Sequence, residues 1–218
     1  MLASPSQTAR LVDLFLLEGI KEKFNKGDFV IRPGETPSYV FYIKKGLVKA
    51  YDITKYNEEN LLIIRKEHEI FPLIWALTGK ERQVIYQSLA NTITYKISQD
   101  KLLKFLYSDP ETLAPMLDMT VEMYRLHSER ILNLEYRTVR ERIISFLITM
   151  SKRFATKEIN GEVLIEVPLR HQDIASSVNA SRETTSREMS SLEKKGLISR
   201  SKSMIVLKDI DRLKKIVE

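Results

Sequence analysis

The chain has 218 residues, enough for a sizeable core in one large or two modest domains, and its net charge of +6 favours an anionic partner. It contains no cysteine, which excludes disulfides, thiolate metal sites and iron–sulfur clusters. It lacks both a signal-peptide pattern and an apolar stretch approaching the about 18 residues of a membrane span, so we expect a cytoplasmic protein.

After an amphipathic segment over residues 9–17, the first half of the chain consists of short, evenly spaced β-type runs. Turn residues separate these runs, notably at 25–27, 32–34 and 45–46. Such spacing is typical of an antiparallel sandwich or roll. The expected strands cover residues 28–32, 39–43, 47–51, 60–65, 84–89 and 92–97.

A long helix is expected after a short helical segment over residues 100–107, opening at Asp109-Pro110 and reaching about Tyr136. One face repeats at steps of four and three, the spacing of a coiled-coil seam, so we predict a parallel homodimer. The alternative is that this face is buried within the chain. The seam residues are Leu113, Leu117, Thr120, Tyr124, His127, Ile131 and Leu134. The neighbouring face, expected to pack on the strands, holds Met116, Met119, Met123, Leu126 and Arg130.

Beyond the long helix, residues 137–140 are expected to form a hinge. Residues 142–154 predict a further helix, and a turn at 160–161 leads into a strand over 162–167. Charge is distributed unevenly: residues 1–139 carry 19 Lys and Arg against 18 Asp and Glu, and residues 140–218 carry 16 against 11. Most of the excess positive charge therefore lies in the C-terminal part.

Residues 169–189 predict two short helices joined by a tight turn. Ser181 is a natural N-cap for the second helix, because its hydroxyl can accept a hydrogen bond from an amide of the first turn. Gly196 is expected to end that helix. At about 100° per residue, the apolar stripe of the second helix lies opposite its polar face. This stripe consists of Thr185, Met189 and Leu192.

The polar face of the second helix carries Arg182, Glu183 and Arg187. Arginine can donate two hydrogen bonds to a guanine edge, and glutamate can accept one from cytosine. The pattern therefore predicts a helix-turn-helix whose second helix enters the major groove of DNA. Residues 197–200 and 203–207 predict a two-stranded wing beside it, with Arg200 and Lys202 at its tip in contact with phosphate.

The run Ser181-Arg-Glu-Thr-Thr-Ser-Arg187 resembles the recognition helix of the cyclic-AMP receptor protein / fumarate-nitrate regulator (CRP/FNR) superfamily of bacterial transcription factors. The resemblance extends from about residue 19 to the C-terminus. It implies an α+β fold with an N-terminal antiparallel β-roll, a cupin-like jelly roll, over residues 1–108. A long dimerisation helix and hinge over 109–138 and a winged helix-turn-helix domain over 139–218 would follow.

The resemblance also implies a function and a set of partners. A homodimer would bind a palindromic promoter site, with half-sites similar to TGTGA, and contact RNA polymerase. Arg182, Glu183 and Arg187 are the implied base-contacting residues. The residues implied to contact phosphate are Arg170, Gln172 and Ser181.

The sensor pocket is expected to differ from that of family members that bind cyclic nucleotides. Those members hold the ribose and phosphate with a Gly-Glu pair and an Arg-Ser pair, whereas the aligned positions here hold Leu73 with Ile74 and Val84 with Ile85. A phosphate buried there would have no charge partner, so control by cyclic AMP is not expected. The pocket either holds an apolar or uncharged effector or is filled by its own side chains, and we favour the second slightly.

His127 and Ser128 occupy the base-facing positions of the long helix and would complete this pocket. His127 also lies in the seam, where it is either a pH-sensitive group or a satisfied histidine. Haem needs only one histidine, but His68, His127 and His171 lie in different predicted elements without ligand spacing. We therefore predict no metal or cofactor.

Two other classes of protein compete with a regulator. A cupin-type enzyme would hold a metal with a His-x-His pair, and the sequence has neither this pair nor a glycine-rich phosphate loop. An enzyme is therefore not expected. The remaining alternative is an effector-sensing or interaction protein whose helix-turn-helix contacts protein, and such a protein would not bind DNA in a salt-sensitive way.

Overall fold

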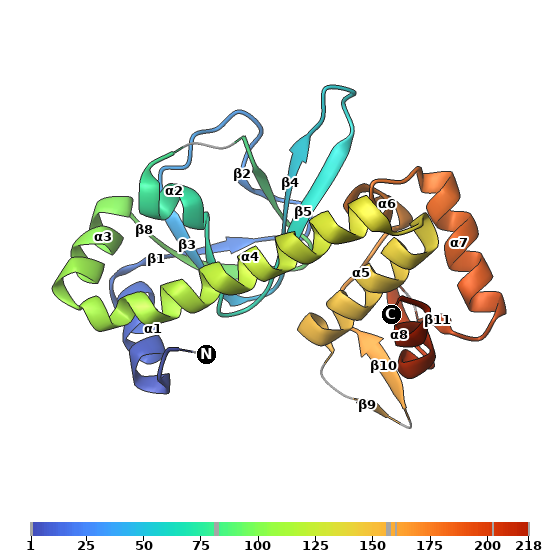
Figure 1. Ribbon diagram of the computed structural model, residues 1–218. Coiled ribbons are helices and arrows are strands. Elements are labelled where there is room, and N and C mark those ends of the chain that lie inside the picture. The colour runs from blue at the N-terminus through green and yellow to red at the C-terminus, as the bar shows by residue number, and fades with distance from the viewer. Residues whose placement is uncertain (1, 81–82, 156–157, 160, 202, 218) are drawn as a thin grey trace. The chain divides into compact units, whose positions relative to one another are not determined.

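The computed structural model describes residues 2–80, 83–155, 158–159, 161–201 and 203–217 (Figure 1). The chain divides into two compact units, residues 1–126 and 127–218. This division lies inside the long helix α4 (Leu113–Tyr136), so α4 contributes to both units.

The first unit is built on two four-stranded antiparallel sheets, with strand orders β1-β8-β3-β6 and β2-β7-β4-β5. The expected β-roll is therefore confirmed. Its strands are β1 (Ile20–Phe24), β2 (Phe29–Ile31), β3 (Val40–Lys45), β4 (Val48–Ile53), β5 (Glu59–Arg65), β6 (Ile70–Phe71), β7 (Ile85–Ser88) and β8 (Thr92–Ile97). Its helical segments besides α4 are α1 (Pro5–Glu18), α2 (Leu73–Thr78), α3 (Gln99–Ser108) and the short 3-10 turn η1 (Pro110–Thr112).

Two apolar clusters form the core of this unit. One lies between the sheets and includes Ile43, Val48 and Phe71, all fully buried. The other joins the helical segments to the roll, with Phe15 of α1 and Leu102 of α3 at its centre. Alternating apolar residues on the strands, each directing every second side chain inward, account for the first cluster.

One face of α4 packs on the cores of the first unit, as the sequence predicts. Met116 is buried, and Met119, Met123 and Leu126 pack against the two clusters. Arg130, expected on the same face, belongs to the second unit, where Nη2 donates to the backbone carbonyl of Ser176 at 3.4 Å.

The neighbouring face of α4, which holds the predicted seam, is largely exposed. Leu113, Leu117 and Ile131 are about half exposed, and Tyr124 is 75% exposed. Thr120 is exposed as well, and its hydroxyl donates to the carbonyl of Met116 one turn earlier at 2.8 Å. A single chain thus leaves a row of large apolar side chains along this helix unburied.

The second unit contains the end of α4, four further helices and one four-stranded sheet with strand order β11-β12-β10-β9. The helices are α5 (Val139–Phe154), α6 (His171–Val178), α7 (Arg182–Lys194) and α8 (Ile210–Val217). The strands are β9 (Glu158–Ile159), β10 (Glu162–Ile165), β11 (Ile198–Ser201) and β12 (Met204–Leu207).

The segment expected as a hinge is shorter than the sequence predicts. Thr138 caps α5, so Val139 and Arg140 are already helical. The guanidinium of Arg137 donates one hydrogen bond to the hydroxyl of Ser145 and another, at 2.6 Å, to the backbone carbonyl of Val217. The non-helical break between α4 and α5 therefore covers Arg137 and Thr138, and residues 139–140 of the expected hinge belong to α5.

No helix in the described part of the chain combines the length and the apolar character needed to cross a membrane.

Candidate nucleic-acid interface

The turn between α6 and α7 is defined by local backbone chemistry. Asn179 ends α6 in the left-handed conformation, with φ of 51°, which asparagine tolerates better than most residues. Ser181 then caps α7, and its hydroxyl accepts a hydrogen bond from the amide of Thr184 at 3.0 Å. The predicted helix-turn-helix is thus present, with α7 as its second helix.

The inner face of α7 is held by packing. Thr185, Met189 and Leu192 are each at most 1% exposed. On α6, Ile174 and Ala175 are fully buried, and Ala175 has a side chain small enough for close helix approach. The predicted stripe of α7 therefore attaches this helix to its own unit and leaves its other side open to solvent.

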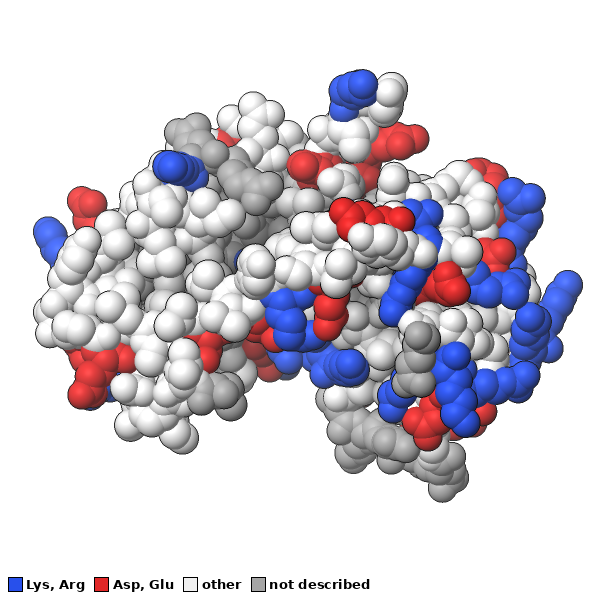
Figure 2. Space-filling view, in the orientation of Figure 1, with Lys and Arg blue, Asp and Glu red and all other residues white. Residues whose placement is uncertain are grey.

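The outer face of α7 carries the three side chains predicted to read bases. Arg182, Glu183 and Arg187 are exposed, and within the described part of the chain none of them makes a side-chain hydrogen bond or an ion pair. In Figure 2, Lys and Arg side chains gather over the region of α7, whereas the surface over the first half of α4 is mostly uncharged. Two guanidinium groups and a carboxylate are thus available to a partner.

Most neighbouring cations are already paired. Arg170 forms a two-point ion pair with the buried carboxylate of Asp173, at 3.0 Å from Nε and 2.9 Å from Nη2. Nε of Arg200 lies 3.5 Å from a carboxylate oxygen of Glu193. Nε of Arg140, on α5, lies 2.7 Å from Oε2 of Glu188 on α7. Arg182 and Arg187, by contrast, form no ion pair with any residue that the structure describes.

The residues implied to contact phosphate lie at the starts of the two helices and on the wing. Arg170 is the N-cap residue of α6, and its side chain remains mostly exposed despite the ion pair. Gln172 is partly buried in the first turn of the same helix, and the exposed Ser181 commits its hydroxyl to the cap of α7. Arg200 lies on β11, and Lys202 lies outside the described residues.

His171, considered above only as a possible haem ligand, lies in the first turn of α6. Its Nε2 is buried and has no hydrogen-bond partner. The pKa of His171 is lowered, chiefly by burial and further by the positive charges of Arg200 and Arg182, while Glu193 opposes the shift. The imidazole is thus held in its neutral form beside the cations of the interface.

This lowered pKa predicts a pH-dependent stability. In the unfolded chain His171 takes up its proton near the ordinary value of about 6.5, whereas the folded protein takes it up only at lower pH. Between these two values the unfolded state binds more protons, so the free energy of unfolding should rise with pH. Denaturant titrations between about pH 5 and pH 8 should show this slope in the native protein and a weaker slope in His171→Gln. An unchanged slope in the variant would contradict this origin.

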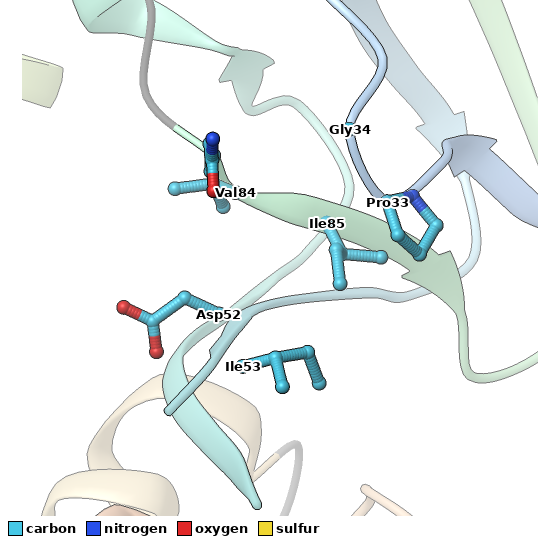
Figure 3. A pocket seen from close by; sticks show the side chains of 7 residues that line it. Pro33, Gly34, Asp52, Ile53, Val84 and Ile85 are labelled. Carbon is cyan, nitrogen blue, oxygen red and sulfur yellow. The ribbon is translucent and has the colours of Figure 1, made fainter. Parts of the chain in front are cut away.

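The first unit contains a cavity of about 360 Å³. In Figure 3, Pro33, Ile53 and Ile85 lie together on one side of this cavity, and the Asp52 carboxylate lies on the other side below Val84. Oδ1 of Asp52 is buried without a hydrogen-bond partner. The cavity wall is thus apolar apart from a carboxylate, an amide side chain and the backbone.

Only part of the predicted sensor pocket lines this cavity. Val84 and Ile85 do so, whereas Leu73 and Ile74 lie on the six-residue helix α2, which the sequence analysis did not predict. Leu73 packs into the core beside α1 and α3, and Ile74 is about half exposed. His127 and Ser128 are partly buried residues of α4 in the second unit.

Among the described residues, no three His, Asp or Glu side chains are grouped as metal ligands would be. Nδ1 of His68 lies 2.7 Å from the hydroxyl of Tyr42, whose pKa is raised by burial and by the nearby charge of Glu67. The exposed His68 is therefore hydrogen-bonded to a buried tyrosine of the roll.

Comparisons with known proteins agree with this geometry. Residues 21–109 match the cyclic nucleotide-binding domain, and residues 141–216 match the Crp-like helix-turn-helix domain. The chain is 28% identical over 212 residues to the anaerobic regulatory protein of Bacillus subtilis, covering 94% of this chain and 88% of the relative. It is 26% identical over 188 residues to the global nitrogen regulator of Synechococcus elongatus, covering 85% and 84%.

Among solved structures, a mutant of CooA from Carboxydothermus hydrogenoformans shares the fold with a TM-score of 0.78 at 20% identity, covering 93% of this chain and 89% of the other. The resemblance carried by the recognition-helix run is thereby confirmed over both units. With a cyclic nucleotide-binding domain followed by a Crp-like helix-turn-helix, the chain belongs to the CRP/FNR superfamily of DNA-binding transcription regulators.

Proposed function

We propose that the protein acts as a homodimer on a palindromic promoter site, with α7 of each protomer in the major groove. The observation that carries this proposal is the outer face of α7, where Arg182, Glu183 and Arg187 are exposed and form no side-chain hydrogen bond or ion pair with the described residues. The buried stripe on the inner face of the same helix supports it, because a reading helix must be held rigidly by its own domain.

The three side chains suit G·C base pairs. Arg182 and Arg187 each offer two parallel donors that fit O6 and N7 of guanine, and Glu183 can accept from N4 of cytosine. We expect half-sites that contain G·C pairs, as in the TGTGA pattern of the family. Arg170, Gln172, Ser181 and Arg200 would contact the backbone, where they set register rather than sequence.

Two of the proposed phosphate contacts need a rearrangement. Arg170 and Arg200 are paired with Asp173 and Glu193, so a phosphate would have to compete with these carboxylates or share the guanidinium with them. Because Arg170 is mostly exposed and offers five donors, sharing requires only a small movement of its side chain.

The exposed row on α4 supports the dimer. One recognition helix reads few base pairs, and two-fold proteins read half-sites about 34 Å apart. A second copy of α4 would cover Leu117, Tyr124 and Ile131 in the manner of a coiled-coil seam. This pairing would bring two copies of α7 to one duplex.

Selection from a pool of randomised duplexes tests the proposed function. The expected result is a palindromic motif containing G·C pairs, with binding that weakens as salt increases because phosphate contacts release counterions. No enriched motif, together with no salt-sensitive binding to any duplex, would favour the alternative in which the helix-turn-helix contacts protein.

We further propose that cyclic AMP does not control this regulator. Among the described residues that line the cavity with Val84 and Ile85, Asp52 is the charged one, and its carboxylate repels a phosphate. An effector that binds in this cavity would be uncharged or cationic. If no effector binds there, the regulator is controlled by other means. We expect about 1 mM cyclic AMP to change neither the thermal midpoint nor the Kd for DNA, whereas a specific ligand at 100 times its Kd would add about 2.7 kcal/mol of stability. A clear upward shift of the midpoint would contradict this proposal.

RNA polymerase is a further proposed partner, on the ground of family membership. A regulator that activates transcription must touch polymerase as well as DNA, and the DNA-reading face of α7 is occupied when DNA is bound. Any polymerase contact would therefore use a surface away from Arg182 and Arg187.

A further inference from the structure

We propose that Arg140 is a positioning residue that sets the orientation of α7 by holding Glu188 and Ser191. These three residues are called the clamp. The inference rests on the proposed function, because it assumes that α7 reads bases. It goes beyond that function by naming a residue on another helix that controls how well α7 discriminates between DNA sequences.

The position of Arg140 is set by the start of α5. The hydroxyl of Thr138 accepts from the amide of Glu141 at 3.4 Å, and Oε2 of Glu141 accepts from the amide of Thr138 at 2.8 Å. This capping box ties both residues to the first turn of the helix. Hydrogen bonds from the hydroxyl and then the amide of Thr138 lower the pKa of Glu141 because they favour its charged form. Arg140 therefore projects from a well-anchored turn.

Arg140 bonds α7 at two points. Its Nε lies 2.7 Å from Oε2 of Glu188, and its Nη2 donates to the hydroxyl of Ser191 at 3.0 Å. Glu188 and Ser191 are three residues apart, so they are neighbours on successive turns of one helix. A planar guanidinium that bonds both points restricts rotation of the helix as well as its position. Lysine would hold only one of them.

The clamp lies on a face of α7 that neither the core nor the proposed DNA site uses. With Arg182 at zero and about 100° per residue, Ser191 and Glu188 lie near 180° and 240°. The buried stripe lies near 300°, and Arg187 lies near 140°. Apolar packing of the stripe is not directional, whereas the clamp has fixed donor and acceptor positions. A rotation of α7 that breaks the clamp also moves the guanidinium of Arg187.

A second ion pair in the same unit offers a matched comparison. The side chains of Arg140 and Glu188 are 37% and 27% exposed. Lys208, just after β12, pairs at 2.6 Å with Glu162 of β10, and these side chains are 37% and 42% exposed. The two pairs thus have similar length and solvent exposure, but only the first holds α7.

The test measures discrimination by the full-length protein, defined as the Kd for a scrambled duplex divided by the Kd for the selected duplex at one salt concentration. Glu188→Gln and Arg140→Lys should each lower this ratio about tenfold, while the Kd for the scrambled duplex stays within about twofold, because phosphate contacts do not depend on the rotation of α7. The reversed pair R140E/E188R should recover part of the ratio, since it restores an ion pair with opposite polarity. The control Glu162→Gln should leave the ratio unchanged.

Three outcomes would overturn the clamp. The first is a ratio that stays within about twofold of wild type in both single variants. The second is parallel weakening on both duplexes together with a lower thermal midpoint, which indicates a general loss of folding. The third is equal loss of the ratio in the control. A wild-type protein that shows no discrimination would instead refute the proposed function, so the two failures are distinguishable.

Discussion

Replacing Arg187 with alanine is expected to weaken binding to the preferred duplex by about 1–3 kcal/mol, or about 5- to 150-fold in Kd. Arg187 is exposed on α7 and makes no ion pair in the described part of the chain. Its removal should therefore delete donors to a base edge without disturbing the fold. Competition titrations against duplexes that differ at single base pairs measure the effect, and one position of each half-site should lose its preference.

Two control variants separate base reading from general electrostatics. Arg212→Ala removes an exposed positive charge of the same unit, on α8. It should change the Kd only slightly, both for the preferred duplex and for the duplexes that differ from it at single base pairs. Arg187→Lys keeps the charge but loses the two parallel donors, so it should resemble Arg187→Ala in specificity. Equal weakening of Arg187→Ala on every duplex would mean that this residue contacts phosphate instead.

Disrupting the exposed face of α4 is expected to have a still larger effect. The double variant L117D/Y124D places carboxylates where the proposed dimer would bury apolar side chains, and the two-fold axis would bring like charges together. We expect a monomer, and an affinity for the palindromic duplex reduced by about 10²- to 10⁴-fold through loss of simultaneous binding to two half-sites. Light scattering gives the molar mass, and a titration gives the Kd.

The chain offers a matched control for this variant. Tyr107 is 82% exposed on α3, comparable with Tyr124 at 75% on α4, and it lies outside the predicted seam. Tyr107→Asp should leave both the molar mass and the affinity unchanged. A dimer that persists in L117D/Y124D would show that the exposed row of α4 is not the interface.

The recognition helix could be predicted in detail because its signals are local. Its N-cap, its buried stripe and its exposed face depend on residues within 13 positions of one helix. Gly196 follows the helix with φ of 67°, a conformation that favours glycine, so the end of the helix could also be predicted from the sequence. The roll was predictable for a similar reason, because its short apolar runs are evenly spaced and separated by turn residues.

Other elements lacked such signals. Strand β1 has no buried residue and carries three consecutive charged side chains, so it does not show the apolar pattern of an inner strand. Helix α2 is only six residues long, too short for a helical repeat to be distinguished from a strand. Leu73 and Ile74 were expected in one pocket with Val84 and Ile85 because the resemblance aligns both pairs with the nucleotide-contacting residues of the family, and no local pattern corrected that expectation. Helix α8 was missed as well, because among the residues that the structure describes in it only Leu213 is buried.

Contacts between residues far apart in the sequence could not be predicted from it either. The residues that Arg140 bonds lie 48 and 51 positions further along the chain, and nothing in the local pattern pairs them. The neutral state of His171 similarly depends on Arg200 of the wing and on burial. Such details depend on tertiary packing, and they decide which cations remain available to DNA.

Hydroxyl-radical footprinting of the full-length protein on its selected duplex tests the central claim most directly. If two copies of α7 read one palindrome, the footprint should show two protected segments about one helical turn, or 34 Å, apart, symmetric about the centre of the site. The mass of the complex should correspond to two chains per duplex. A single protected segment bound by one chain, or no protection on the selected duplex, would contradict the account.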